Sequence, residues 1–81
     1  MAVYDIAPVG DEWVTLPAPT ADAWLQPVNG ELLWTTRAVP EASKAFRLKD
    51  DYALSIGSGN VVKIRSALPG QLINVVMEDK P

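Results

Sequence analysis

The sequence predicts an all-β protein, a small antiparallel β-sandwich or barrel that carries an extended, proline-rich N-terminal arm. Short runs rich in β-branched and aromatic residues recur along the chain with turn residues between them, which is typical of such folds. No stretch keeps the 3.6-residue period of an amphipathic helix. The chain has 81 residues, enough for one domain at most.

The first segment, residues 1–22, is predicted to be the arm, and residues 23–81 are predicted to be the sandwich body. Proline removes a backbone donor and disfavours helix at the residue before it, so a proline-rich segment is expected to run extended. The prolines of this segment are Pro8, Pro17 and Pro19. One short strand is expected within it, at residues 12–16.

The body is predicted to begin with a β-hairpin. Residues 24–28 and 31–36 are apolar runs on either side of Asn29-Gly30. Asn-Gly between two such runs is typical of a type I′ turn, which needs positive φ at both central positions. Because Pro27 has no N–H to donate, its strand is expected to lie at a sheet edge.

The second strand of that hairpin contains three consecutive apolar residues, Leu32-Leu33-Trp34. Successive side chains of a strand point to opposite faces. Both faces of this strand are therefore expected to be covered, one of them by the opposing sheet.

The second half of the chain continues as short strands and turns. Residues 37–44 fit either one helical turn, with Pro40 at its first position, or a loop. Further strands are expected at residues 45–48, 52–56, 61–67 and 71–77, and a charged tail at 78–81. Turns are expected at 49–51 and 68–70, and residues 57–60 are interpreted as a hairpin loop.

The composition leaves few ways to stabilise so small a domain. A chain of this size buries only about 60% of the surface that its unfolded form exposes. Small domains therefore usually rely on a disulfide, a metal or a partner subunit. The chain has no Cys and no His, so we expect no metal and no cofactor, and association with other chains is the remaining device.

The same absences indicate a non-catalytic protein. Triads and thiol chemistry need His or Cys. Asp50 and Asp51 are adjacent and are interpreted as part of a solvated turn. Gly57-Ser58-Gly59 lacks the helix that a phosphate loop or a nucleophile elbow requires after its strand.

The sequence argues against nucleic acid and a membrane as partners. The formal net charge is −3, and the seven Lys and Arg residues are dispersed along the sequence, so direct nucleic-acid binding is not expected. No apolar run approaches the ~20 residues of a membrane span. The start of the chain lacks the features of a secretory signal, so synthesis in a cytoplasm is expected.

Hydrophobic residues make up 48% of the chain, more than so small a core is expected to hide, so part of this surface is predicted to face a partner. Trp13 and Trp24 fit plain packing, a subunit interface or stacking on a sugar ring, whereas Trp34 is more typical of a core residue. The candidate interface comprises Trp13, Val14, Leu16, Trp24, Leu32 and Trp34.

The chain resembles the small β-sandwich structural proteins of tailed-bacteriophage virions, such as capsid decoration or cement proteins. The resemblance covers roughly residues 11–77 and lies in Val14-Thr15-Leu16-Pro17 and in the strand-and-turn cadence of the second half. It implies a homo-oligomer, often a trimer, that is made in the host cytoplasm, resides in the virion and clamps the major capsid protein or another virion protein. It transfers no site residue.

Two other functions compete with this one. The tryptophans and the β fold also fit a carbohydrate- or surface-binding module of a tail fibre or adhesin. The negative charge alone fits a small acidic inhibitor. In the decoration hypothesis, the arm adds a strand to a neighbour's sheet edge, where backbone hydrogen bonds provide affinity.

Overall fold

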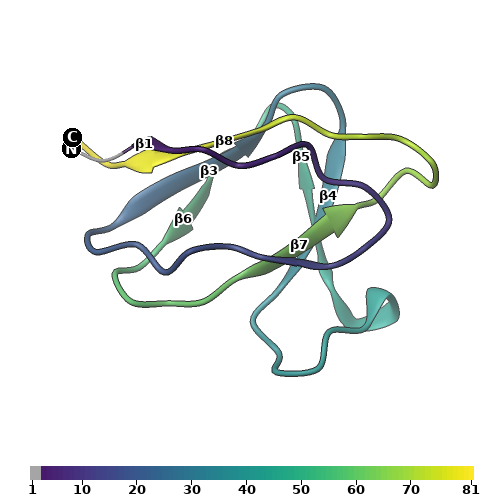
Figure 1. The fold of residues 1–81 in the computed structure, drawn as a ribbon, viewed down its shortest axis with the longest axis horizontal. Helices are drawn as coiled ribbons and strands as arrows, with labels where there is room; N and C mark the ends of the chain where they lie inside the picture. Colours follow the sequence, from purple (N-terminus) through teal and green to yellow (C-terminus); the bar gives the residue numbers. More distant parts are fainter. Residues whose placement is uncertain (1–2) are drawn as a thin grey trace.

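The structure is a computed structural model that describes residues 3–81, and within these residues eight β-strands form two four-stranded antiparallel sheets (Figure 1). The strand order is β1-β8-β3-β6 in the first sheet and β2-β7-β4-β5 in the second. The prediction of an all-β, antiparallel fold is confirmed.

The strands are short, as the spacing of turn residues predicts. The first sheet contains β1 (Val3–Tyr4), β8 (Val75–Asp79), β3 (Ala23–Pro27) and β6 (Leu54–Ile56). The second sheet contains β2 (Val14–Thr15), β7 (Lys63–Ser66), β4 (Glu31–Thr35) and β5 (Phe46–Lys49). Between β4 and β5 the chain makes one turn of 3₁₀ helix, η1 (Ala42–Lys44), which resolves the choice between a helical turn and a loop.

The core lies between the inner faces of the two sheets. Alternation places it there: Val62, Ile64 and Ser66 are buried, while Lys63 and Arg65 between them are only half-buried. Eleven buried apolar residues form the core cluster: Val9, Leu16, Ala23, Leu25, Leu32, Leu48, Ile56, Val62, Ile64, Ile73 and Met77. Full burial of a large aliphatic side chain contributes about 1.5–3 kcal/mol, so these side chains are the main source of stability.

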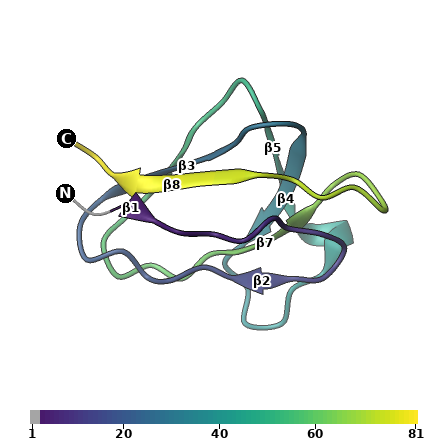
Figure 2. The same cartoon turned by 45° about the horizontal axis from the view of Figure 1, so that its top comes forward.

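Consecutive strands mostly belong to different sheets. Among the described strands, β4 and β5 are the one pair that is adjacent both in the chain and in a sheet. Every other connection crosses from one sheet to the other, so the chain winds between the two layers (Figures 1 and 2). The two predicted hairpins, at Asn29-Gly30 and at residues 57–60, are therefore wrong, and the strand expected at 71–77 begins only at Val75.

The predicted hairpin at Asn29-Gly30 is the clearest correction. β3 and β4 lie in different sheets, and Asn29 does not have the positive φ of a type I′ turn. Instead, the Asn29 side-chain Oδ1 accepts a 2.7 Å hydrogen bond from the backbone N–H of Asn74, just before β8. Gly30 serves close packing, because a Cβ at this position would lie 2.5 Å from Cδ1 of Ile73.

Pro27 lies in a central strand and not at a sheet edge. Val28 donates its N–H to the carbonyl of Asn74 on the β8 side, and adjacent residues of a strand donate to opposite sides. The missing N–H of Pro27 therefore faces β6. Since β6 pairs only with Ala23, Trp24 and Leu25, the proline leaves no ladder hydrogen bond unmade.

The segment at residues 57–60 is a turn, but it is not a hairpin loop. It connects β6 in the first sheet to β7 in the second. Asn60 donates its N–H to the carbonyl of Gly57, and Gly59 donates to the carbonyl of Pro19 over 2.7 Å. The turn is thus held against residues 19–22, and Ser58 adds a hydrogen bond from its N–H to the carboxylate of Asp22.

Residues 3–22 run extended along the molecule and are packed against it. β1 pairs with β8, β2 pairs with β7, and Val9 exchanges two backbone hydrogen bonds with Ile73. Val9, Leu16 and Pro19 are fully buried. The division into arm and body stays a prediction about behaviour in an assembly. In the single chain, this segment contributes side chains to the same core.

The first two residues of the charged tail predicted at 78–81 are instead part of a strand. β8 starts at Val75 and continues through Glu78 and Asp79, which pair with β3 on one side, while Glu78 also pairs with β1 on the other. Asp79 is buried, and its Oδ1 accepts a 3.1 Å hydrogen bond from the hydroxyl of Tyr4. A carboxylate is tolerated here because a buried polar group with hydrogen-bond partners avoids most of the desolvation cost.

Candidate functional site

Within residues 3–81, no group of three or more carboxylates is placed to hold a metal ion. Asp50 and Asp51 are exposed in the turn after β5, where Tyr52 donates its N–H to the carbonyl of Lys49. The candidate functional surfaces are therefore the outer faces of the two sheets.

Within residues 3–81, no helix has the length and apolar character that crossing a bilayer would require.

Two of the six candidate interface residues lie in the core. Leu16 and Leu32 are fully buried between the sheets. Leu16 is fixed there by the hydrogen bond from its N–H to the carbonyl of Val62. In this fold these two side chains stabilise the domain and present no surface to a partner, which corrects the expectation for both.

Trp34 and Val14 occupy intermediate positions. The Trp34 ring packs partly against the core and stacks on Phe46, with 4.9 Å between ring centroids and 28° between ring planes. Phe46 itself is largely exposed. Val14 pairs with Ile64 at the margin of the second sheet and is partly exposed. Val14, Trp34 and Phe46 thus each leave part of their apolar surface exposed.

Trp24 lies on the outer face of the first sheet, in the inner strand β3, and is 39% exposed. Its register partners on that face are Glu78 of β8 and Ser55 of β6. We name the first-sheet face by its outward residues Val3, Trp24, Gln26, Ala53, Val76 and Glu78.

The first-sheet face contains a shallow hollow of about 260 Å³, lined by all of these residues except Val3. Lys80 closes one side of Trp24, since its Nζ lies 4.3 Å from the ring centroid and donates a 2.6 Å hydrogen bond to the hydroxyl of Ser55. The indole is thus held in one orientation beside a small, mostly apolar depression. Such an aromatic group suits contact with another surface or with a ring.

The outer face of the second sheet is basic. Direct partners in antiparallel strands point to the same face, and Leu33 of β4 is paired with Arg47 on one side and with Arg65 on the other. Lys49 pairs with Glu31, and Lys63 pairs with Thr35. We name the second-sheet face by Glu31, Leu33, Arg47, Lys49, Lys63 and Arg65.

Leu33 is nearly buried although it lies on this outer face, with 9% of its surface exposed. The long stems of its neighbours Arg47 and Arg65 are the groups placed to cover it, since arginine can bury its aliphatic stem and keep its charge in water. The guanidinium of Arg65 lies over the half-buried ring of Trp13, 5.8 Å from the centroid. The expected cover on both faces of Leu32-Leu33-Trp34 is thus observed.

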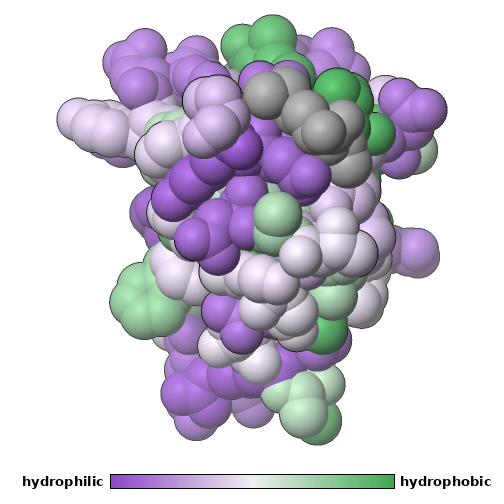
Figure 3. Space-filling model, turned by 90° about the vertical axis from the view of Figure 1, so that its left-hand side faces the viewer, coloured by the Kyte–Doolittle hydropathy of each residue, from purple (hydrophilic) through white to green (hydrophobic). Residues whose placement is uncertain are grey.

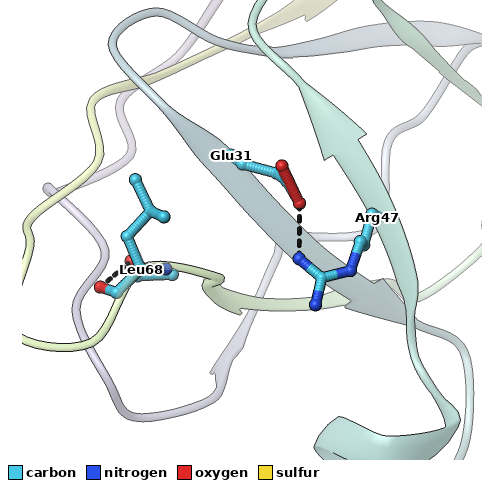
Figure 4. A network of polar contacts seen from close by, with 4 residues as sticks. Glu31, Arg47 and Leu68 are labelled. Atoms are coloured by element: carbon cyan, nitrogen blue, oxygen red, sulfur yellow. Dashed lines mark hydrogen bonds and ion pairs between the residues drawn. The ribbon is translucent and has the colours of Figure 1, made fainter.

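One carboxylate shares the face with these cations. Figure 4 shows Glu31 on β4 and Arg47 on β5 with their side chains directed toward each other, and Arg47 Nη1 lies 2.6 Å from Glu31 Oε2. The Arg47 side chain is nevertheless two-thirds exposed. Just after β7, the Ser66 hydroxyl donates a 2.8 Å hydrogen bond to the carbonyl of Leu68 and accepts one of 3.0 Å from the Leu68 N–H.

The gathering of cations is the feature that the sequence-based interpretation missed. Arg47 and Lys49 are two residues apart, as are Lys63 and Arg65, so alternation alone puts each pair on one strand face. The sequence does not show that both strands flank β4, and this pairing brings four of the chain's seven cations together.

The remaining surface is mixed. Seen from the end of the molecule where β1 lies, hydrophilic residues dominate, and hydrophobic residues form separate patches of limited size (Figure 3).

Comparisons with family models, with curated proteins and with solved structures found no match to this chain.

Proposed function

We propose that this protein is a non-catalytic structural subunit that decorates or cements a viral particle, and that its copies associate through the first-sheet face. The observation that carries this proposal is the exposed Trp24 beside a mostly apolar hollow of the first-sheet face. Tryptophan near the centre of a contact surface is among the residues that contribute most to protein association.

The position of Trp24 supports an interface. β3 is a central strand of its sheet, so the indole stands on the face and not at a frayed edge, and Val76 and Val3 extend the exposed apolar surface around it. A stable interface covers ~800 Å² of each partner, which is about one sixth of the 4801 Å² surface of this chain.

The type of particle is proposed from the resemblance of residues 11–77 to capsid decoration proteins of tailed phages. The partners are then other copies of the chain, as a trimer, and the major capsid protein or another virion protein, and the site of action is the virion. Because residues 3–22 are packed in the single chain, we propose that attachment uses preformed surfaces. Repeated weak contacts on a regular lattice add up through multivalency.

The native mass of the purified protein tests the association. We expect a discrete trimer for the wild type and a monomer for Trp24→Ala, because the substitution removes the largest apolar group of the face. Val39→Ala is the matched control, since Val39 is exposed in the connection between β4 and β5. A Trp24→Ala protein that keeps both its circular dichroism spectrum and its oligomeric mass contradicts the proposal.

A second candidate function rests on the hollow beside Trp24. An aromatic ring flanked by Gln26 and Glu78 offers stacking together with polar groups, the combination that sugar rings require. A glycan array probed with the wild type and with Gln26→Ala separates this function from the first. Binding of a glycan that Gln26→Ala abolishes supports it, and the absence of any bound glycan excludes it.

A further inference from the structure

The second-sheet face concentrates positive charge in a chain that is acidic as a whole. Four cations occupy the outward positions of β5 and β7, on both sides of β4. Among the residues paired on this face, Glu31 is the one carboxylate. Asp50 lies at its edge, where it lines a shallow hollow with Glu31 and Lys49. The face is therefore positive on balance, whereas the net charge of the chain is −3.

Three of these cations are held in position by other groups, and two of the four are well exposed. Arg65 is held by Trp13, and Lys63 donates a 3.1 Å hydrogen bond to the carbonyl of Arg37. Arg47 keeps two-thirds of its side chain exposed while it contacts Glu31, and Lys49 is exposed. Groups that are already held in position lose less conformational entropy when they bind a partner.

The spacing of the cations follows the repeat of an extended chain. Arg47 and Lys49, and likewise Lys63 and Arg65, are separated by two residues on one strand, or about 6.6 Å at ~3.3 Å per residue. An extended peptide that has acidic residues at alternate positions presents its carboxylates on one side at the same repeat. Arginine and lysine on the two strands can then contact successive carboxylates.

The face suits a polypeptide better than a nucleic acid. Proteins that bind single strands present aromatic side chains on which bases stack. The aromatic group seen on this face is Trp13, which is half-buried and already covered by Arg65. The contact between Arg47 and Glu31 also shows that a carboxylate fits against these cations at hydrogen-bonding distance.

We propose that the second-sheet face docks an acidic, extended polypeptide segment whose carboxylates stand at alternate positions. The segment lies along β4, between the flanking strands β5 and β7, and contacts Arg47, Lys49, Lys63 and Arg65. This interaction is separate from the association through the first-sheet face, so failure of either proposal leaves the other unaffected.

Fluorescence anisotropy with the full chain tests this proposal. The probe is a labelled twelve-residue peptide of alternating Glu and Ser, and the comparison probes are a peptide with six Glu followed by six Ser and a twelve-nucleotide oligo-dT. We expect the alternating peptide to bind most tightly and its affinity to fall as salt is raised, because salt screens exposed charges.

Charge-neutralising variants locate the site. We expect Arg47→Gln combined with Lys49→Gln to weaken binding of the alternating peptide about tenfold, since each exposed ion pair contributes modestly and two are lost. Lys49→Gln alone should weaken it severalfold, while the matched control Lys44→Gln, an exposed lysine of η1, should change it less than twofold.

Three results would overturn the proposal. The first is tighter binding of oligo-dT than of the alternating peptide. The second is equal binding of the alternating and the block peptide, or no binding of either peptide. The third is an equal loss of affinity in Lys49→Gln and Lys44→Gln. Conserved circular dichroism spectra of the variants verify that each comparison is made on folded protein.

Discussion

At the scale of single residues, a hydrogen-bond partner decides whether a buried carboxylate is tolerated. Asp79 is buried in β8 and accepts a hydrogen bond from Tyr4 of the neighbouring strand β1. This bond joins two positions that are 75 residues apart. It therefore ties the start of the described chain to its end.

Removing the hydroxyl of Tyr4 tests that connection. Tyr4→Phe keeps the ring but leaves the Asp79 carboxylate with one donor fewer, so we expect the free energy of unfolding to fall by about 1 kcal/mol. Tyr52→Phe is the matched control, because Tyr52 is largely exposed in the turn before β6, and it should be neutral. Urea denaturation followed by tryptophan fluorescence measures both. Equal stability of the two variants would show that the hydrogen bond contributes nothing.

Sequence patterns predict individual residues well where alternation decides the outcome. Val62, Ile64 and Ser66 are buried as the period-two pattern requires. Asn29 and Gly30 show where the pattern fails. The same dipeptide that favours a type I′ turn here binds Asn74 and makes room for Ile73. Both partners lie more than 40 positions away in the chain, so no local pattern indicates them.

At the scale of elements, the positions of the strands are more predictable than their partners. Hydrophobic alternation reports that a segment has a buried face, but it is silent on which strand lies beside it. The second-sheet face depends on this second kind of information. Arg47 and Arg65 become neighbours only because β5 and β7 both pair with β4.

β8 provides an element-scale prediction. Residues 78–81 resemble a dispensable charged tail, yet Glu78 pairs with Val3 and Trp24, and Asp79 pairs with Ala23. Deleting 78–81 should therefore remove most of the stability, which totals only about 5–15 kcal/mol for a typical domain. Deleting Pro81 alone is the control and should be harmless, because Pro81 lies beyond the strand and is exposed.

Thermal unfolding followed by circular dichroism distinguishes the two truncations. We expect the longer deletion to lower the melting temperature strongly or to give an unfolded chain at room temperature. A cooperative transition at the wild-type temperature would mean that β8 ends before Glu78 and that these residues form a free tail.

At the scale of the whole molecule, the two sheets present chemically different faces to their surroundings. One is centred on an exposed tryptophan beside a shallow hollow, and the other on a nearly buried leucine beneath four cations. The apolar residues of the sequence indicate the first kind of surface. The second requires the complete strand order, since charges that are scattered along the chain converge only in three dimensions.

The alternation of strands between the two layers has a kinetic consequence. Apart from β4 and β5, no strand of the described chain can pair with its neighbour in sequence, so nearly every ladder must close a long loop before it gains any hydrogen bond. Proteins with such non-local pairing fold in roughly milliseconds to seconds, and not in microseconds. Stopped-flow refolding monitored by tryptophan fluorescence should show this slow regime, and a microsecond phase with full amplitude would contradict it. Since β8 is central in the first sheet and follows the sheet's other three strands in the sequence, that sheet cannot assemble during synthesis until residue 79 has left the ribosome.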